Sequence, residues 1–176
     1  MTTNILISGF GGQGVLFTGK FLAYEGLLED KEVTWLPSYG PEMRGGTASC
    51  SVIISDEPIG SPLVSKPDVL IAMNLPSLDK FEDTVAPGGM IFFDSSLIDR
   101  EVKRTDVKAF GIPATKMASD EGISTLANMI VMGKMLKETS LFATESIDMT
   151  LAKVVSAKKA SLLELNKKAI KTGYEL

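Results

Sequence analysis

The sequence feature that most constrains the fold is a glycine-rich turn between an apolar segment and a helical one. Residues 4–10 (NILISGF) have the composition of a strand, and residues 14–30 carry apolar side chains near helical spacing. Between them, Gly9, Gly11 and Gly14 follow the pattern G-x-G-x-x-G. Glycine lacks a Cβ atom, so the backbone can turn sharply and approach a ligand, while N–H groups at a helix start favour an anion.

Strand-like and helical segments continue to alternate over the first two thirds of the chain. No helix is expected between the second and third strands, so the sheet is not expected to be purely parallel there. We predict an α/β fold: one Rossmann-like, doubly wound domain spanning residues 1–176, with a mostly parallel sheet and a helical C-terminal third. Apolar and β-branched residues place the later strands at 32–37, 47–55, 68–74, 88–94 and 105–112, and the later helices at 76–85, 123–139 and 159–176.

The composition argues against several classes of protein. The net charge is −4, with 22 acidic residues against 18 basic ones, which disfavours duplex nucleic acid as a partner. The single cysteine, Cys50, cannot form a disulfide framework or a four-cysteine metal site, and the absence of histidine removes the commonest metal ligand and general base. The start of the sequence lacks a basic signal region, and no apolar run approaches the roughly 20 residues that span a bilayer. We therefore expect a cytoplasmic protein that contacts neither nucleic acid nor membrane.

The glycine turn alone does not establish a dinucleotide site. Such a site needs an acidic residue at the end of the second strand, to bind the ribose hydroxyls. Leu36, Pro37 and Ser38 occupy that position, and no carboxylate occurs before Glu42. Three interpretations stay open: the glycines only permit close packing of helix on strand, they approach another phosphate-bearing group, or they bind a dinucleotide.

The second candidate segment is the polar tract that follows the second strand, residues 38–46 (SYGPEMRGG). Arg44 offers a planar fork for a carboxylate or phosphate, and the two glycines after it allow close approach. The alternative is that Arg44 pairs locally with Glu42, a contact worth under about 1 kcal/mol if exposed. If the first two strands are parallel neighbours, this tract and the glycine turn emerge at one carboxyl edge, which we expect to bind a ligand. The residues expected to contact it are Gly11, Gly12, Gln13, Gly14, Ser38, Tyr39, Gly40, Glu42, Arg44, Gly45 and Gly46.

Four further polar or reactive residues fit structural roles as well as functional ones. Asn74 and Asp94 end later strands and would extend the polar edge. Cys50 alternates within a strand, which favours a small buried side chain over a nucleophile. Asn128 lies among apolar residues, so its buried amide needs partners, and a tether from helix to loop is favoured over catalysis.

Together these motifs resemble a known family. Residues 9–15 (GFGGQGV), 37–55 (PSYGPEMRGGTASCSVIIS) and 58–62 (PIGSP) are similar to the gamma subunit of 2-oxoacid:ferredoxin oxidoreductases, as is the ending at 166–176 (NKKAIKTGYEL). The likeness covers nearly the whole chain. The form SYGPEMRGG is closer to the 2-oxoglutarate and branched-chain versions than to the pyruvate version.

The resemblance implies an assembly whose chemistry is done elsewhere. Such complexes decarboxylate a 2-oxoacid with thiamine diphosphate, pass electrons through iron–sulfur clusters to ferredoxin and transfer the acyl group to coenzyme A. Thiamine diphosphate and Mg²⁺ belong to alpha and beta subunits, and the clusters to other cysteine-rich subunits. The gamma subunit is implied to be non-catalytic, inactive when isolated and free of metal, closing over the partner site and helping to accommodate coenzyme A.

Two alternatives are carried beside this reading. One is an autonomous dinucleotide-binding oxidoreductase. The other is a purely structural assembly module, which would use residues 123–136 and an apolar C-terminal stripe as contact surfaces. That stripe consists of Leu162, Leu165, Ala169 and Ile170.

Overall fold

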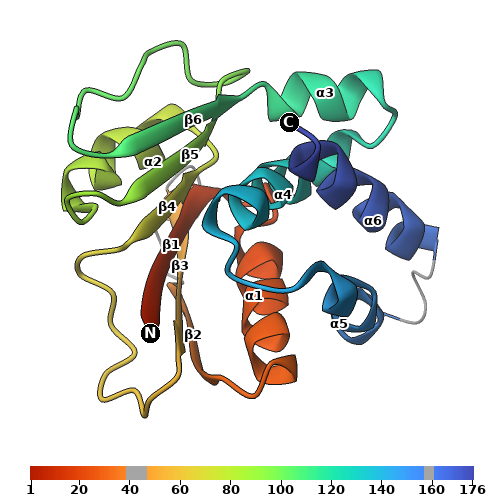
Figure 1. Cartoon of the computed structure of the whole chain (residues 1–176). Coiled ribbons are helices and arrows are strands. Elements are labelled where there is room, and N and C mark those ends of the chain that lie inside the picture. The colour runs from red at the N-terminus through yellow and green to blue at the C-terminus, as the bar shows by residue number, and fades with distance from the viewer. Residues whose placement is uncertain (39–46, 157–160) are drawn as a thin grey trace.

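The computed structural model describes residues 1–38, 47–156 and 161–176, and within them one mixed sheet is flanked by helices (Figure 1). The strands are β1 (Thr2–Phe10), β2 (Glu32–Ser38), β3 (Thr47–Ser55), β4 (Val69–Ala72), β5 (Met90–Asp94) and β6 (Lys108–Ile112). The helices are α1 (Val15–Leu28), α2 (Leu75–Phe81), α3 (Ala114–Asp120), α4 (Ala127–Thr139), α5 (Ile147–Val154) and α6 (Ser161–Tyr174). Short 3-10 turns occupy Glu82–Thr84, Ser124–Leu126 and Thr144–Ser146.

The strand order is β2-β3-β1-β4-β5-β6, and this corrects one expectation from the sequence. The first two strands are not neighbours, because β3 lies between them and pairs antiparallel with both. A chain that returns from β2 without a helix pairs back on itself as an antiparallel strand. The other pairings, β1 with β4, β4 with β5 and β5 with β6, are parallel. The expected α/β fold with a mostly parallel sheet and a helical C-terminal third is therefore confirmed.

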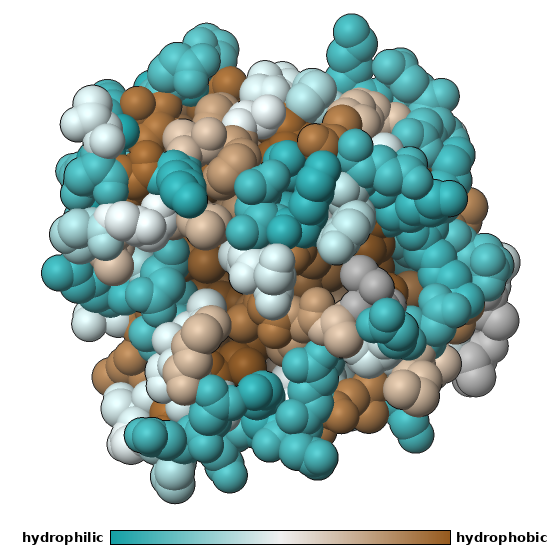
Figure 2. Space-filling model, in the orientation of Figure 1, coloured by the Kyte–Doolittle hydropathy of each residue, from teal (hydrophilic) through white to brown (hydrophobic). Residues whose placement is uncertain are grey.

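Helices cover both faces of the sheet, as a doubly wound arrangement requires. Because successive strand residues point to opposite faces, Ile5 and Ile7 of β1 join the larger core with α1, α3, α4, α5 and α6. Leu6 joins a smaller core on the other face, against Leu78 of α2. Seen from the side of α4 and α5, hydrophobic atoms are visible mainly toward the middle of the surface and hydrophilic ones over most of its periphery (Figure 2).

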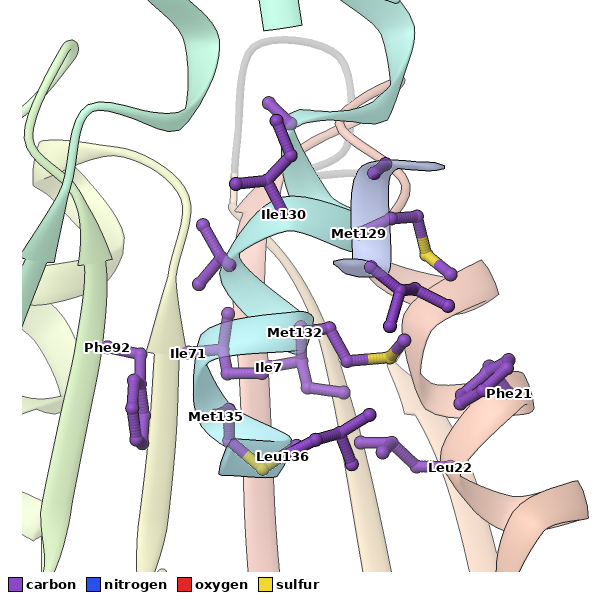
Figure 3. Packing of buried hydrophobic residues seen from close by; sticks show 14 of the residues in the cluster. Ile7, Phe21, Leu22, Ile71, Phe92, Met129, Ile130, Met132, Met135 and Leu136 are labelled. Atoms are coloured by element: carbon purple, nitrogen blue, oxygen red, sulfur yellow. The ribbon is translucent and has the colours of Figure 1, made fainter. Parts of the chain in front are cut away.

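Helix α4 is the centre of the larger core. Met129, Ile130, Met132 and Met135 are fully buried between the sheet, α1 and α6. Figure 3 shows them beside apolar side chains of β1, β4, β5 and α1. The expected buried helix is confirmed, and the region that a purely structural module would use for assembly is inside the core instead.

Helices α4 and α6 touch through their backbones at two glycines. A Cβ atom on Gly133 would overlap the carbonyl oxygen of Ile170, and one on Gly173 would overlap the carbonyl oxygen of Ile130. The expected apolar stripe of α6 is only partly correct, since Ala169 and Ile170 are buried while Leu165 is exposed.

A buried carboxyl group joins α1 to the segment that leads into α5. Glu25 of α1 is fully buried, and its Oε1 accepts a hydrogen bond from the Ser146 hydroxyl. Burial raises the pKa of Glu25 above its usual value, and the negative charge of Glu29 adds to the rise, while the hydroxyls of Ser146 and Thr150 oppose it. The second oxygen, Oε2, has no hydrogen-bond partner among the described residues.

We predict that Gly173→Ala destabilises the protein by about 1–3 kcal/mol, because overpacking forces the two helix backbones apart. This loss exceeds the gain of roughly 0.5–1 kcal/mol that alanine brings to a helix interior. Urea denaturation measures the difference. The control is Gly60→Ala, since a Cβ there has no atom within 4 Å. Equal midpoints for the two variants would refute the close helix contact.

We also predict that Glu25→Gln removes part of the pH dependence of stability. Because the folded pKa of Glu25 lies above the unfolded value of about 4.3, the stability from this group is fully present below that pH. It is lost as pH rises through the folded pKa. Denaturation from about pH 4 to pH 8 should therefore show wild type losing stability relative to Glu25→Gln. The exposed replacement Glu101→Gln is the control, and parallel curves for wild type and Glu25→Gln would refute the prediction.

Candidate functional site

The glycine turn lies at the carboxyl edge of β1, where it connects directly to α1. Gln13 N donates to Phe10 O at 3.2 Å, which closes the turn. Gly12 and Gly14 have φ angles of 91° and 74°, in the left-handed region that side chains other than glycine rarely adopt. Gly11 and Gly12 are exposed at the edge, while Gln13 and Gly14 are half-buried.

The side chain of Gln13 is used inside the protein. Its Oε1 accepts from Phe10 N at 2.7 Å and from Asn74 Nδ2 at 3.3 Å, and its Nε2 donates to Met73 O at 3.1 Å. Both ends of the amide are thus occupied in tying the turn to the end of β4. These contacts shape the turn, and the expected ligand contact of Gln13 stays a prediction.

Two of the motif glycines permit close packing. A Cβ on Gly9 would lie 2.7 Å from Gln13 Oε1, and one on Gly14 would lie 2.7 Å from Asn128 Cγ. Asn128 is buried and its Nδ2 donates to Gly14 O at 3.3 Å and to Thr18 Oγ1 at 3.0 Å. The expected tether from helix to loop is present, linking the start of α4 to the turn.

A cavity opens beside the turn at the start of α1. Its volume is about 280 Å³, and helix α1 has no side-chain cap at Gly14. The N–H groups of the first helical turn have no partner within the helix, so they can meet an anion at this position. Among the described residues that line the cavity, none carries a negative charge. They are Phe10, Gly11, Gly12, Gly14, Val15, Leu16, Phe17 and Ala48.

A second cavity of about 340 Å³ shares Gly14 and Phe17 with the first. It lies where α1, α4, α5 and α6 meet, and both Asn128 and Asn166 line it. Asn166 is buried, and its Nδ2 donates to Leu162 O at 2.7 Å within its own helix. Asn166 and the wall residue Phe17 were not identified from the sequence. For Phe17 the available signal was its position in the first turn of the helix.

The flanks of the polar tract lie at the same edge as the glycine turn. Phe10 pairs with Thr47, while Ser8 and Ser38 both pair with Ser49 across the three antiparallel strands. Although β3 separates β1 from β2, the two strands run in the same direction and end together. The other expected ligand contacts, Tyr39, Gly40, Glu42, Arg44, Gly45 and Gly46, lie outside the described residues, so their role stays a prediction.

The polar residues after the later strands serve as helix caps. Asn74 Oδ1 accepts from Ser77 N at 2.9 Å and so caps α2. The carboxylate of Asp94 accepts from Ser96 N at 3.0 Å and from Thr115 N at 3.1 Å, which holds the start of α3. Both side chains are buried and support the edge of the sheet. Beside them, the start of α1 at the glycine turn has no side-chain cap.

Cys50 is buried under α1, as expected for a small apolar side chain. A Cβ on Gly19 would overlap its sulfur atom. Burial raises the pKa of the Cys50 thiol to about 12, so the thiolate is not formed near neutral pH. In the part of the chain that the structure describes, no cluster of three His, Cys, Asp or Glu could hold a metal ion. No helix there is long and apolar enough to cross a membrane.

We predict that Gln13→Ala destabilises the protein by about 1–3 kcal/mol, because Met73 and Asn74, which are buried, lose their hydrogen bonds to the amide. Thermal unfolding measures the change. The control is Ser61→Ala, which removes an exposed contact from Leu63 N to Ser61 Oγ and should alter stability by at most about 0.5 kcal/mol. A Gln13→Ala effect no larger than this control would contradict the bracing role.

Comparison with known proteins places this geometry in a family. The chain is 41% identical over 171 residues to the ketoisovalerate oxidoreductase subunit VorA of Methanothermobacter thermautotrophicus, covering 97% of this chain and 35% of that protein. It is 35% identical over 179 residues to the 2-oxoglutarate synthase subunit KorC of Methanocaldococcus jannaschii, covering 100% of this chain and 94% of that protein. The chain thus spans about a third of the first relative and nearly all of the second.

Solved structures show the same fold. The gamma subunit of a keto/oxoacid ferredoxin oxidoreductase from Geobacter sulfurreducens has a TM-score of 0.80 at 31% identity, covering 98% of this chain and 96% of that one. The 2-oxoglutarate:ferredoxin oxidoreductase from Magnetococcus marinus has a TM-score of 0.86 at 24% identity, covering 99% of this chain and 30% of that one. A family model described as pyruvate ferredoxin/flavodoxin oxidoreductase matches residues 4–176. The chain therefore belongs to the pyruvate ferredoxin/flavodoxin oxidoreductase family, and its resemblance to the gamma subunits of 2-oxoacid:ferredoxin oxidoreductases is confirmed.

Proposed function

We propose that this chain is the non-catalytic gamma subunit of a multi-subunit 2-oxoacid:ferredoxin oxidoreductase. In this role it closes over an active site formed by partner subunits and helps to accommodate coenzyme A. The observation that carries the proposal is the carboxyl edge, where the uncapped start of α1 and the flanks of the tract 38–46 meet beside one cavity.

The edge suits the anionic part of coenzyme A better than it suits catalysis. The first-turn N–H groups of α1 attract a phosphate, and the part of the cavity lining that the structure describes contains no carboxylate to oppose it. The tract adds Arg44, whose guanidinium can pair with a phosphate. Within the sequence there is no histidine, and the one thiol is buried away from this edge beneath Gly19. Proton transfer and carbon chemistry are therefore assigned to partner subunits.

The remaining cofactors are assigned to the partners for the same reason. Thiamine diphosphate, Mg²⁺ and iron–sulfur clusters would be held by the alpha, beta and cluster-bearing subunits, and ferredoxin would accept the electrons. The Magnetococcus marinus enzyme was solved with 2-oxoglutarate, coenzyme A and succinyl-CoA bound, so that relative binds both proposed reactants. Because the identity is 24%, the likeness of that enzyme to this chain concerns the fold alone.

We assign 2-oxoglutarate as the 2-oxoacid. The form SYGPEMRGG favours 2-oxoglutarate or a branched-chain 2-oxoacid over pyruvate. The match to KorC, which extends over nearly the full length of both chains, favours 2-oxoglutarate. The VorA relative points to a branched-chain 2-oxoacid instead. An assay of the assembled complex with 2-oxoglutarate and with ketoisovalerate decides between them: a higher kcat/KM for ketoisovalerate would overturn the assignment.

A dinucleotide-dependent oxidoreductase is disfavoured by the end of β2. A dinucleotide site takes its ribose-binding carboxylate from the end of a second strand that lies parallel beside β1. Here antiparallel β3 lies beside β1, and the end of β2, residues 35–38, carries no carboxylate.

The gamma-subunit role is tested by co-expression with the alpha, beta and cluster-bearing subunits and purification through a tag on this chain. We expect the companions to be recovered together, with 2-oxoacid-dependent reduction of ferredoxin in the eluate. Omission of this chain should reduce the coenzyme A-dependent rate. Recovery of this chain alone, together with an unchanged rate when it is omitted, would refute the role.

Arg44→Ala tests the contribution to coenzyme A binding. We predict that KM for coenzyme A rises about tenfold while the complex stays assembled, because one charge-assisted contact of roughly 1.5 kcal/mol is lost. Steady-state kinetics of the whole complex measure this. Lys137→Ala is the matched control, because it removes an exposed positive charge near the end of α4, away from the glycine turn where that helix begins. An unchanged KM in Arg44→Ala would leave the tract a structural element only.

A further inference from the structure

Helix α1 is apolar on the side that faces away from the core as well as on the side that faces into it. Its inner side buries Phe21, Leu22 and Glu25 against the sheet, α4 and α5. The opposite side, called here the outer face of α1, is made of six residues at helical spacing. They are Leu16, Phe17, Lys20, Tyr24, Leu27 and Leu28.

The outer face exposes large side chains to solvent. Tyr24, Leu27 and Leu28 are 37%, 56% and 41% exposed, while Leu16 and Phe17 are half-buried and pack partly against the larger core. Lys20 is the one charged residue of the six, and its Nζ lies 5.8 Å from the centre of the Tyr24 ring. The other charged residue of the helix, Glu25, is buried against the α5 side.

A surface helix normally keeps its outer side polar. Helix α6 does so for the most part: its exposed residues include Glu164, Lys168 and Lys171 beside Leu165 and Tyr174, while Ala169 and Ile170 face the core. A helix that is apolar all round belongs in an interior. The outer face of α1 therefore has the composition of a surface that is covered in the working protein.

The apolar surface continues at both ends. At the start of α1, Leu16 and Phe17 also line the cavity at the glycine turn. Along its side lies Trp35 of the edge strand β2, which is 41% exposed and packs next to Gly19. Exposed tyrosine and tryptophan with few charges are the composition of interface centres.

We propose that the outer face of α1 is the surface through which this chain binds a catalytic companion subunit of the oxidoreductase. The inference rests on the proposed function and adds the place of contact. Its first support is continuity, since the face runs without a break from the glycine-turn cavity, which is proposed to meet the partner active site.

The second support is the length of the relatives. In the VorA relative the segment that matches this chain is 35% of one longer polypeptide, so peptide bonds keep it with the rest of that protein. In the KorC relative the match is 94% of the chain, as for a separate subunit. A separate subunit that works at another chain's active site needs a non-covalent surface in place of that linkage, and an apolar face rimmed by aromatic residues supplies one.

Introducing a negative charge on the outer face of α1 tests the proposal in the co-expressed complex. Leu27→Glu and Tyr24→Glu alter exposed positions, so the variants should keep the wild-type circular dichroism and unfolding midpoint. We expect each to recover at least tenfold less alpha and beta subunit through the tag. Leu63→Glu is the matched control, because Leu63 is 72% exposed in the connection between β3 and β4, and we expect wild-type recovery. Wild-type recovery with both α1 variants would overturn the inference.

A thiol introduced at position 27 gives a second test of the contact, one that does not depend on charge. In Leu27→Cys the introduced thiol is exposed, while Cys50 is buried and stays unreactive. Maleimide labelling of the introduced thiol should slow at least tenfold when the companion subunits are present. Equal labelling with and without them would overturn the inference.

The outcomes separate this inference from the proposed function. If the wild-type chain recovers no companion subunit, the proposed function is wrong and the inference falls with it. If wild type and α1 variants recover the companions equally, only the place of contact is wrong. Sedimentation of the isolated chain tests whether a second copy of this chain occupies the outer face of α1 instead. A dimer that Leu27→Glu dissociates, while the variant still binds the companion subunits, would also overturn the proposal.

Discussion

The burial of α4 between the sheet, α1 and α6 is the interaction on which the rest of the structure depends. Its apolar side chains fill the larger core, and its start is fixed to the glycine turn through the Asn128 amide. Because Gly133 and Gly173 bring the backbones of α4 and α6 into contact, the C-terminal helix is fixed by the same element. A change in the position of α4 would therefore move the turn that forms the candidate site, even though α4 contributes mainly apolar residues.

The carboxyl edge shows how helix starts are divided between structure and function. Asn74 and the Asp94 carboxylate satisfy the starts of α2 and α3 from within the protein. At α1 the adjacent side chain, Gln13, turns inward to Met73 and Phe10, and Gly14 offers no side chain. The N–H groups of α1 therefore keep their capacity for an external anion. The difference among the three helix starts, more than the G-x-G-x-x-G spacing itself, marks the turn as the candidate binding position.

Local patterns in the sequence predicted local structure and missed what depends on distant residues. Apolar runs located the strands, and a buried amide at Asn128 indicated the tether that the structure contains. The insertion of β3 between β1 and β2 was not predicted, because the pairing of Phe10 with Thr47 is set by the whole sheet. The inward role of Gln13 depends on Met73, 60 positions away. The short helices α3 and α5 were missed because neither has a long apolar period. The contribution of Arg44 and its neighbours stays a prediction.

Helix α1 explains why hydrophobic periodicity misleads when a helix carries apolar residues on two sides. Leu16, Leu22, Ala23 and Leu27 follow near-helical spacing in the sequence, yet Leu22 is fully buried while Leu27 is 56% exposed on the outer face. A single apolar stripe would describe a helix with one buried side. Apolar residues on both sides describe a helix with two sides suited to burial, and the isolated chain can bury only one of them. Under the proposed contact, a companion subunit covers the second side of α1, which accounts for large apolar side chains at positions that the isolated chain leaves exposed.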